Sequence, residues 1–274
     1  MKSLLLLLCI CCVWKLHAQD VSRTLNFPKL VERPAVKPSQ KNIWVYVMAG
    51  QSNMAGRGLV EPKDTLSDSR ILTIDRNGQL ILAKEPLNLH EPSMVGLDCG
   101  MSFARTLLKH IPKDISILVL HTAVGGSSIQ KWIHDSIHRE VPLLTNFKNR
   151  IQQARQYGEI KGILWHQGES DANEKGIPLY IHNLKSLFTQ FRFICENPNL
   201  PIVMGELGYF SKTSHESFMA INALMHEYKQ IDSRAAVVSS KRLDHKGDFL
   251  HFNSEGQREL GARYARLFLK KFKP

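Results

Sequence analysis

The 274-residue sequence contains few cysteines and no second long apolar run, and both shortages exclude classes of protein. Because the one long apolar stretch lies at the extreme N-terminus, a protein with several membrane spans is excluded. Three of the five cysteines, Cys9, Cys11 and Cys12, lie inside that stretch. The other two, Cys99 and Cys195, are too few for a disulfide framework or a four-ligand zinc site. They could form one bridge or remain two separate buried thiols.

Acidic residues are also scarce, since 25 Asp and Glu stand against 36 Lys and Arg, for a formal net charge of +11 at pH 7. No P-loop, zinc knuckle or helix-turn-helix signature accompanies the basic residues, so a nucleic-acid partner is not expected. The histidines show no zinc-binding spacing, and we expect no metal and no cofactor. The surplus of positive charge is compatible with an acidic glycan as a partner.

The N-terminal apolar stretch has the features of a secretory signal peptide. Lys2 supplies a positive start, residues 4–14 are apolar apart from the cysteines, and Ala18 offers a small residue before a cleavage site. The stretch is shorter than the roughly 20 residues that a transmembrane helix needs. We therefore expect residues 1–19 to be a signal peptide and the protein to be secreted or periplasmic, without stable membrane insertion. Residues 20–41, rich in Pro and Lys, predict an N-terminal arm or linker.

From residue 42 to residue 274, short apolar runs alternate with helical patterns and predict a single domain. The apolar runs are rich in β-branched residues and bounded by polar ones, as in buried parallel strands; they span residues 43–47, 115–120, 160–165, 202–204 and 235–238. Helices are predicted over residues 101–110, 143–157, 179–194, 216–230 and 254–272. Residues 71–83 suggest a β-hairpin with Asn77 and Gly78 at its turn. This order predicts a three-layer α/β/α sandwich with a mainly parallel sheet.

The first predicted strand ends in a Gly-rich segment around Ser52. Ligands of an open parallel sheet bind beyond the carboxyl ends of its strands, which makes this segment a place to search for chemistry. Gly50 and Gly56 allow a tight turn that would expose Ser52 and direct backbone N–H groups toward a developing anion. Ser52 is therefore a candidate nucleophile whose own N–H could stabilise an oxyanion. Taken alone, the segment is equally compatible with a capped strand-to-helix turn.

A serine nucleophile requires a base, and His251 lies just before the last predicted helix. Asp248 precedes it by three residues and could turn back to accept the Nδ1–H of His251. That bond would fix the tautomer that leaves Nε2 facing Ser52. The alternative is that Asp248 is only a turn residue.

Polar segments also follow two other predicted strands. After the third strand, the amide of Gln167 could donate to an oxyanion, and Glu169 could support His251 or a neighbouring Arg; the structural alternative here is helix capping. After the second strand, Gly125 and Gly126 would let a backbone N–H approach a reacting carbonyl.

Together the four segments resemble SGNH-type hydrolases, and specifically their sialate O-acetylesterase and acetylxylan esterase branch. The matching segments are Gly50–Gly56 (GQSNMAG), Gly125–Ser127 (GGS) with Trp132 beyond it, Trp165–Asp171 (WHQGESD) and Asp248–His251 (DFLH). The resemblance extends from about Ile43 to the last helix and implies the SGNH, flavodoxin-like hydrolase fold. It implies Ser52 as nucleophile, His251 as general base and acid, and Asp248 as the carboxylate that orients the base.

The resemblance also implies an oxyanion hole formed by the N–H groups of Ser52 and Gly126 and the side chain of Gln167. Gln167 stands where the wider superfamily usually has Asn. Two alternatives stay open, because Gly125 could replace Gly126 and Glu169 could share or take the acidic role.

The function expected from this resemblance is a serine esterase that removes O-acetyl groups from a carbohydrate through an acetyl-enzyme. Arg57 and Trp132 are candidate substrate contacts, by hydrogen bonding and aromatic packing respectively, although each could be structural. One alternative is a carbohydrate-binding protein that retains an esterase-like fold without catalysis. Another is an SGNH esterase or lipase for non-carbohydrate esters, which would need a wider apolar acyl pocket.

Overall fold

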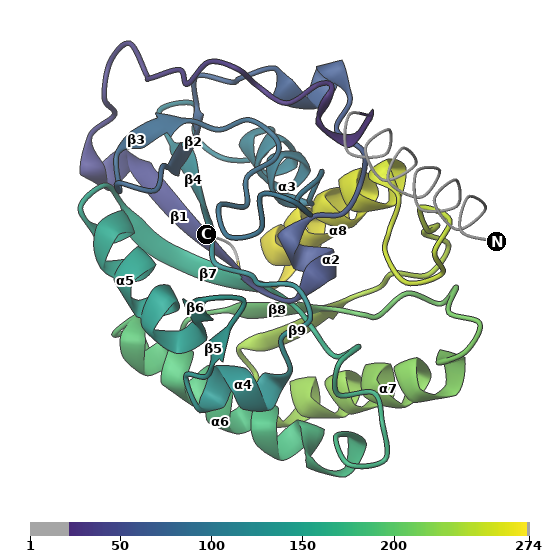
Figure 1. The fold of residues 1–274 in the computed structure, drawn as a ribbon. Helices are drawn as coiled ribbons and strands as arrows, with labels where there is room; N and C mark the ends of the chain where they lie inside the picture. The colour runs from purple at the N-terminus through teal and green to yellow at the C-terminus, as the bar shows by residue number, and fades with distance from the viewer. Residues whose placement is uncertain (1–21, 273–274) are drawn as a thin grey trace, which may run out of the picture.

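The computed structural model describes residues 22–272 (Figure 1). The predicted signal peptide, residues 1–19, lies outside the described residues. No helix within residues 22–272 is both long and apolar enough to cross a membrane.

A seven-stranded sheet forms the centre of the molecule, in the order β3-β2-β4-β1-β7-β8-β9. Its strands are β1 (Ile43–Gly50), β2 (Ile71–Ile74), β3 (Leu80–Leu82), β4 (Ser116–His121), β7 (Glu159–His166), β8 (Ile202–Gly205) and β9 (Ala235–Val238). All neighbours are parallel except β2 and β3, which form the antiparallel hairpin expected from the Asn-Gly turn. The mainly parallel sheet predicted from the sequence is confirmed.

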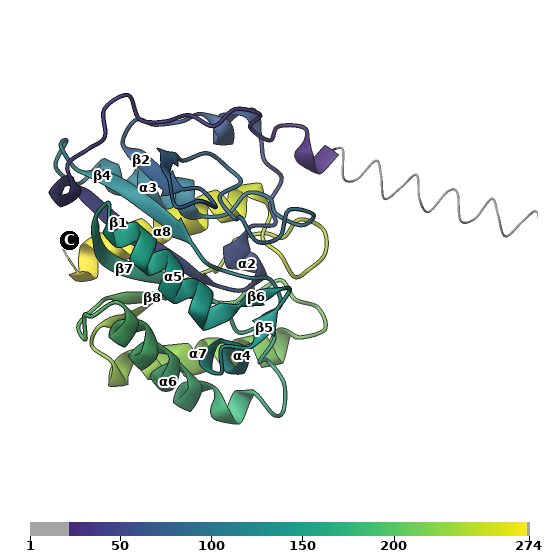
Figure 2. The ribbon, with the colours of Figure 1, turned by 60° about the vertical axis from the view of Figure 1, so that its left-hand side comes forward.

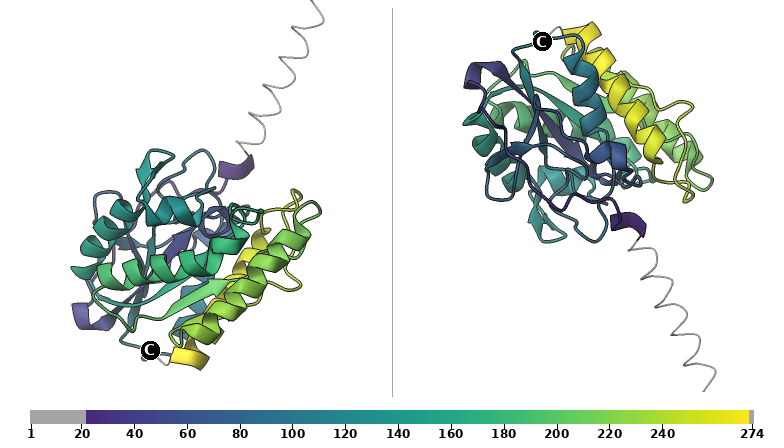
Figure 3. Two further views of the ribbon diagram at one scale, coloured as in Figure 1. Left: turned by 90° about the horizontal axis from the view of Figure 1, so that it is seen from below. Right: turned by 90° about the horizontal axis from the view of Figure 1, so that it is seen from above.

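Helices cover both faces of the sheet, as a three-layer sandwich requires. The helices are α2 (Ser52–Ala55), α3 (Gly100–Leu108), α4 (Ile129–Ile133), α5 (Leu143–Arg155), α6 (Tyr180–Ile194), α7 (His215–Ile231) and α8 (Ser254–Phe272). Helices α3 and α8 lie side by side on one face (Figure 3), and α5, α6 and α7 pack on the other (Figure 1). A small second sheet, β5 (Ile137–His138) with β6 (Val141–Pro142), and the short α4 were not predicted from the sequence.

The central strand β1 is apolar throughout because both of its faces are covered. Successive side chains point to opposite faces, so Val45 and Val47 belong to the core under α5, α6 and α7. Tyr46 faces the other way, where its ring packs edge-on against Phe103 of α3 and Phe268 of α8, with centroids 4.9 and 5.1 Å away. The side-chain contacts on both faces of the sheet hold β1, and with it the position of its carboxyl end.

Three strands whose carboxyl ends precede predicted site segments are direct neighbours, because β1 lies between β4 and β7. The end of β1 approaches β7 so closely that a Cβ on Gly50 would lie 2.1 Å from the carbonyl oxygen of His166. Gly50 has a φ of +137°, and the next residue, Gln51, donates its N–H to that same oxygen at 2.9 Å. Only glycine allows this turn, which aims the chain into α2 directly above the sheet edge.

The described part of the predicted arm is held against the domain by hydrogen bonds. The N–H of Leu82 on the edge strand β3 donates to the carbonyl oxygen of Glu32 at 2.8 Å. Nearer its start, the arm is attached by the Arg23 side chain, which donates to the carbonyl oxygen of Val95 at 2.7 Å. These bonds connect the arm with both the sheet edge and the loop that follows β3.

Cys99 and Cys195 are both buried and free. They belong to the two core clusters on opposite faces of the sheet, which explains why they form no bridge.

Candidate active site

The structure brings Ser52, His251 and Asp248 into one chain of hydrogen bonds. His251 Nε2 lies 3.0 Å from Ser52 Oγ at the start of α2, and His251 Nδ1 lies 2.7 Å from Asp248 Oδ2. The other carboxylate oxygen, Asp248 Oδ1, accepts the backbone N–H groups of Leu250 and His251 at 3.0 and 2.8 Å. The Asp therefore holds the loop that carries the His as well as the imidazole ring.

The electrostatics of this chain favour a neutral imidazole beside an ionised carboxylate. Burial lowers the pKa of His251, and the neighbouring Asp248 carboxylate opposes that shift without cancelling it. Burial would raise the pKa of Asp248, but the hydrogen bonds from His251 and Leu250 lower it to about 2. A neutral His with its Nδ1–H held by a carboxylate presents a free electron pair on Nε2 to the Ser hydroxyl, as a general base must.

Asn53, immediately after Ser52, fastens the His251 loop to the nucleophile turn. Its Nδ2 donates to the carbonyl oxygen of Leu250 at 3.1 Å, and its Oδ1 accepts the N–H of Phe252 at 3.1 Å. The amide thus holds the backbone on both sides of His251. Asn53 Nδ2 also donates to Glu169 Oε1 at 2.7 Å. Sequence reasoning missed this role of Asn53, although its position next to the candidate nucleophile was a signal.

Glu169 lines the site, but within residues 22–272 its side chain makes no hydrogen bond or ion pair with His251. Within the described chain, its only hydrogen-bond partner is Asn53, whereas Asp248 bonds directly to the imidazole. Burial raises the pKa of Glu169 to about 7. The geometry therefore places the carboxylate of Asp248 beside the His251 imidazole, whereas Glu169 is connected to the His251 loop through Asn53.

Two backbone N–H groups are free to receive an anion. Within residues 22–272, neither the N–H of Ser52 nor that of Gly126 donates to another group. The N–H of Gly125 is already committed, because it donates to Glu91 Oε2 at 2.7 Å. Of the two glycines left open by the sequence, Gly126 is the one with an available donor.

Gln167 does not occupy the predicted place in the oxyanion hole. Its side chain is fully buried behind the cavity, where Nε2 donates to Gln51 Oε1 at 3.1 Å, to the carbonyl oxygen of Ser127 at 3.3 Å and to Asp171 Oδ2. The predicted direct contact with the oxyanion is corrected: the interior carboxylate of Asp171 draws the amide inward. Gln167 instead joins the turn before Ser52 to the turn after Gly126.

The side-chain amide that faces the cavity beside Ser52 belongs to Gln51, whereas the sequence had predicted the amide of Gln167 there. Gln51 Oε1 accepts from Gln167 Nε2 at 3.1 Å and from the backbone N–H of Ser170 at 3.2 Å, which fixes the orientation of the amide. Its Nε2 has no acceptor in the described part of the chain, and the residue lines the same cavity as Ser52. An oriented amide with free N–H groups beside a nucleophile is a candidate oxyanion donor.

The cavity above Ser52 measures about 340 Å³, and most of the residues that line it have polar or charged side chains. Arg57 is buried in its wall, with Nη2 at 3.0 Å from both carboxylate oxygens of Glu91. Arg139, more exposed at the rim, lies 3.1 Å from the same carboxylate. Arg57 thus lies where a substrate contact was predicted, although Glu91 engages part of its guanidinium. The lining residues are Gln51, Ser52, Arg57, Met94, Gly125, Gly126, Arg139, Glu169, Ser170, Ser214, Phe218, Leu250 and His251.

Trp132 is a core residue and not a substrate contact. It is fully buried, and its indole Nε1 donates to Ser127 Oγ at 2.8 Å. Its rings pack edge-on against Trp165 and Phe191, with centroids 5.7 and 5.8 Å away. The short helix α4, which the sequence did not predict, turns this side chain away from the cavity, so the predicted substrate contact is wrong.

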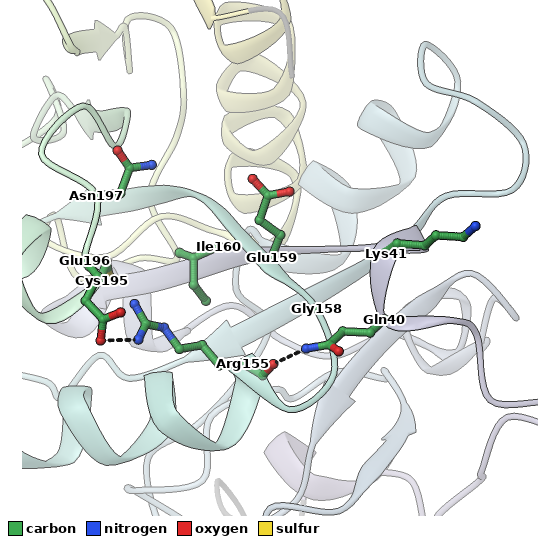
Figure 4. A pocket seen from close by; sticks show the side chains of 9 residues that line it. All are labelled: Gln40, Lys41, Arg155, Gly158, Glu159, Ile160, Cys195, Glu196 and Asn197. Carbon is green, nitrogen blue, oxygen red and sulfur yellow. Dashed lines mark hydrogen bonds and ion pairs between the residues drawn. The ribbon is translucent and has the colours of Figure 1, made fainter.

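A larger cavity of about 540 Å³ lies at the opposite, amino ends of β1 and β7 (Figure 4). Its wall contains Lys41, Glu159 and an ion pair between Arg155 and Glu196. Because the Ser52 site lies at the carboxyl ends of the same strands, the two cavities are at opposite ends of these strands. Cys195 lines this second cavity, but no His is among its described lining residues, so it lacks the pairing of a nucleophile with an imidazole that is found at Ser52.

Comparison with known proteins connects this geometry with esterases. The model of a family described as carbohydrate esterase, sialic acid-specific acetylesterase, matches residues 42–270. A probable carbohydrate esterase of Arabidopsis thaliana is 27% identical over 264 residues, which cover 88% of this chain and 96% of that protein. Its X-ray structure matches with a TM-score of 0.73, over 85% of this chain and 99% of that one.

Two further solved structures share the fold at lower identity. The structure of NanS matches with a TM-score of 0.69 and 18% identity, over 86% of this chain and 98% of that one. A carbohydrate acetylesterase from Xanthomonas citri matches with a TM-score of 0.60 and 17% identity, over 84% of this chain and 56% of that one.

Proposed function

Because the chain belongs to the carbohydrate esterase family of sialic acid-specific acetylesterases, we propose that it is a serine esterase that hydrolyses O-acetyl esters on carbohydrates. The observation that carries the proposal is the hydrogen-bonded chain from Ser52 Oγ through His251 to Asp248, at 3.0 and 2.7 Å. Unlike the fold, which serves many functions, this arrangement has a specific chemical consequence: it activates a hydroxyl for attack on a carbonyl.

In the proposed reaction, Ser52 Oγ attacks the ester carbonyl while His251 Nε2 accepts the hydroxyl proton. The carbonyl oxygen becomes an oxyanion, which the N–H groups of Ser52 and Gly126 and the Gln51 amide stabilise. The imidazolium then gives its proton to the departing sugar oxygen and leaves an acetyl group on Ser52. Water, deprotonated by His251, attacks the carbonyl of this ester. The imidazolium then returns its proton to Ser52 Oγ as the bond from Oγ to the carbonyl carbon breaks, and the acetyl group leaves as acetic acid, which ionises to acetate. Asp248 stabilises the imidazolium in both halves of the reaction.

The walls of the cavity favour a sugar ester over a long acyl chain. Hydrophobic residues among the lining are confined to Met94, Phe218 and Leu250, whereas most of the remainder offer hydrogen-bonding groups. A lipase would need an apolar channel for the acyl chain, and acetyl requires room for one methyl group. The proposed ligand is therefore a hydroxylated sugar that carries a short acyl group.

An acidic sugar fits the cavity better than a neutral one. Two guanidinium groups, of Arg57 and Arg139, share the single carboxylate of Glu91. This leaves an excess positive charge at the rim, where Arg139 is partly exposed. A substrate carboxylate would pair with it, so we place acetylated sialic acid ahead of acetylated xylan as the substrate.

Acetate release from a panel of esters tests the proposal. The panel consists of O-acetylated sialic acid, acetylated xylo-oligosaccharides, and a chromogenic alcohol esterified with acetyl, butyryl or octanoyl groups. We expect acetyl esters to be preferred and the Ser52→Ala variant, folded by circular dichroism, to release no acetate above background. Saturable glycan binding without acetate release would favour the non-catalytic alternative, and a preference for octanoyl esters would favour a lipase.

A further inference from the structure

The peptide group that joins Gly125 to Gly126 is held from behind by His138. The Nε2 of His138 lies 2.9 Å from the carbonyl oxygen of Gly125. A trans peptide group is planar, so this carbonyl and the N–H of Gly126 point in opposite directions from one rigid unit. A donor that fixes the carbonyl on the far side therefore fixes the direction of the N–H on the cavity side.

Both partners of His138 require the same tautomer. Lys131 Nζ lies 2.9 Å from His138 Nδ1, and an ammonium group can only donate, so Nδ1 is the acceptor. A carbonyl oxygen can only accept, so Nε2 carries the proton and donates to Gly125. The neutral imidazole is thus oriented at both nitrogens, and the other tautomer would lose both hydrogen bonds.

The peptide needs such a restraint because glycines flank it on both sides. Gly126 has a φ of +76°, and a Cβ built on it would meet nothing closer than 3.6 Å. With little steric barrier, the peptide plane could rotate and turn the Gly126 N–H away from the substrate. On its other side, the unit is anchored by the Gly125 N–H, which donates to Glu91. His138 supplies the remaining hold on the plane of the peptide.

His138 and Lys131 reach this peptide from elements outside the main sheet. His138 lies on β5, whose hairpin with β6 turns through Arg139 and Glu140 at φ values of 49° and 66°. Lys131 lies on α4, and Figure 2 shows α4 and this hairpin at the same end of the molecule as α2. His138 does not line the cavity, so it would act on the substrate only through the peptide.

We propose that His138 is a positioning residue that aims the Gly126 N–H at the oxyanion, with Lys131 fixing its tautomer. The inference rests on the proposed esterase function, because only an acyl-transfer reaction develops an oxyanion there. The series Lys131, His138, peptide and oxyanion forms a line of hydrogen bonds that starts at a cation and ends at the developing negative charge. Each bond in such a line polarises the next, so the restraint also strengthens the final donor.

Matched substitutions at position 138 test the proposal. His138→Met removes the hydrogen-bond donor. His138→Gln introduces a side chain similar to Met in length and volume, but one that retains an N–H near the position of the His138 Nε2. For acetyl-ester hydrolysis, we expect His138→Met to lower kcat by about 10-fold to 100-fold with KM within about two-fold, since removal of a whole oxyanion donor costs on the order of 10²–10³. His138→Gln should recover most of the loss. His134→Leu, which changes an exposed His on the same segment, should behave as wild type.

Three outcomes would overturn the inference, and a fourth measurement applies if His138→Met does not fold. A kcat for His138→Met within two-fold of wild type, in a background where Ser52→Ala is inactive, overturns the positioning role alone. Equal losses in the Met and Gln variants would also overturn it, because the donor would then be irrelevant. Retained turnover by Ser52→Ala overturns the proposed function together with this inference. If His138→Met does not fold, Lys131→Met leaves the ring in place, and a kcat unchanged by this substitution would contradict the tautomer argument.

Discussion

Replacing Asn53 by Ala should both destabilise the protein and impair its catalysis. The Asn53 side chain is fully buried and makes hydrogen bonds to Leu250, Phe252 and Glu169 at 3.1, 3.1 and 2.7 Å. Truncation leaves a backbone carbonyl, a buried backbone N–H and a carboxyl oxygen without partners. At about 1–3 kcal/mol for each unsatisfied group, and with water reaching some of them, the expected loss is about 3–6 kcal/mol in the free energy of unfolding.

Urea unfolding monitored by tryptophan fluorescence measures this loss, with Asn199→Ala as the control. Asn199 is exposed and its side chain makes no hydrogen bond in the described structure, so its substitution should change the free energy of unfolding by less than about 0.5 kcal/mol. At temperatures where the Asn53→Ala variant remains folded, kcat should fall while KM changes little, because the His251 loop is no longer fastened to the nucleophile turn. A loss below about 1 kcal/mol together with wild-type kcat would refute the reasoning.

Three other predictions concern the base, the oxyanion and a buried acid. Catalysis needs neutral His251, and burial lowers the pKa of this His. As the pH falls, kcat/KM should therefore decline only below about pH 6.5, and a decline that begins above pH 7 would contradict the prediction. Gln51→Ala should lower kcat on the order of 10²-fold in acetate release; an equal kcat for Gln51→Ala and wild type would remove Gln51 from the oxyanion hole. Burial raises the pKa of Asp98 to about 7, so the folded protein retains this proton longer than the unfolded chain does. The stabilising contribution of that proton is complete below the unfolded pKa of about 4 and is lost as the pH rises to about 7. Between these pH values the free energy of unfolding, measured with urea, should therefore fall less steeply in Asp98→Asn than in the wild-type protein. An equal dependence on pH in the two proteins would count against this prediction.

The sheet and the residues of the Ser–His–Asp chain were predictable from the sequence because their signals are local. Apolar β-branched runs such as the one in β1 are buried on both faces, and that pattern is characteristic of parallel strands. The family resemblance drawn from the four segments is confirmed by the match over residues 42–270. Ser52 and His251 could be paired from the sequence because the chemistry of a serine nucleophile demands a base.

The predictions that differ from the structure concern side chains whose orientation depends on contacts made only in the folded protein. Gln51 and Gln167 both follow strands, and only the interior position of Asp171 decides which amide turns inward. Trp132 follows a Gly-rich segment in the sequence, but a short helix turns it into the core. His138 lies on a two-residue strand, too short to give a periodic signal, so its approach to the Gly125 carbonyl could not be foreseen.

Trapping the acyl-enzyme tests the central claim most directly. The protein is mixed with an excess of an acetyl ester, quenched in acid within the first turnovers, and digested for peptide mass spectrometry. The account predicts one added acetyl group on the peptide that contains Ser52, fragment ions that localise it to that side chain, and no such adduct in Ser52→Ala. Acetate release by the wild-type protein with no acetylated Ser52, or with the same rate in Ser52→Ala, would contradict it.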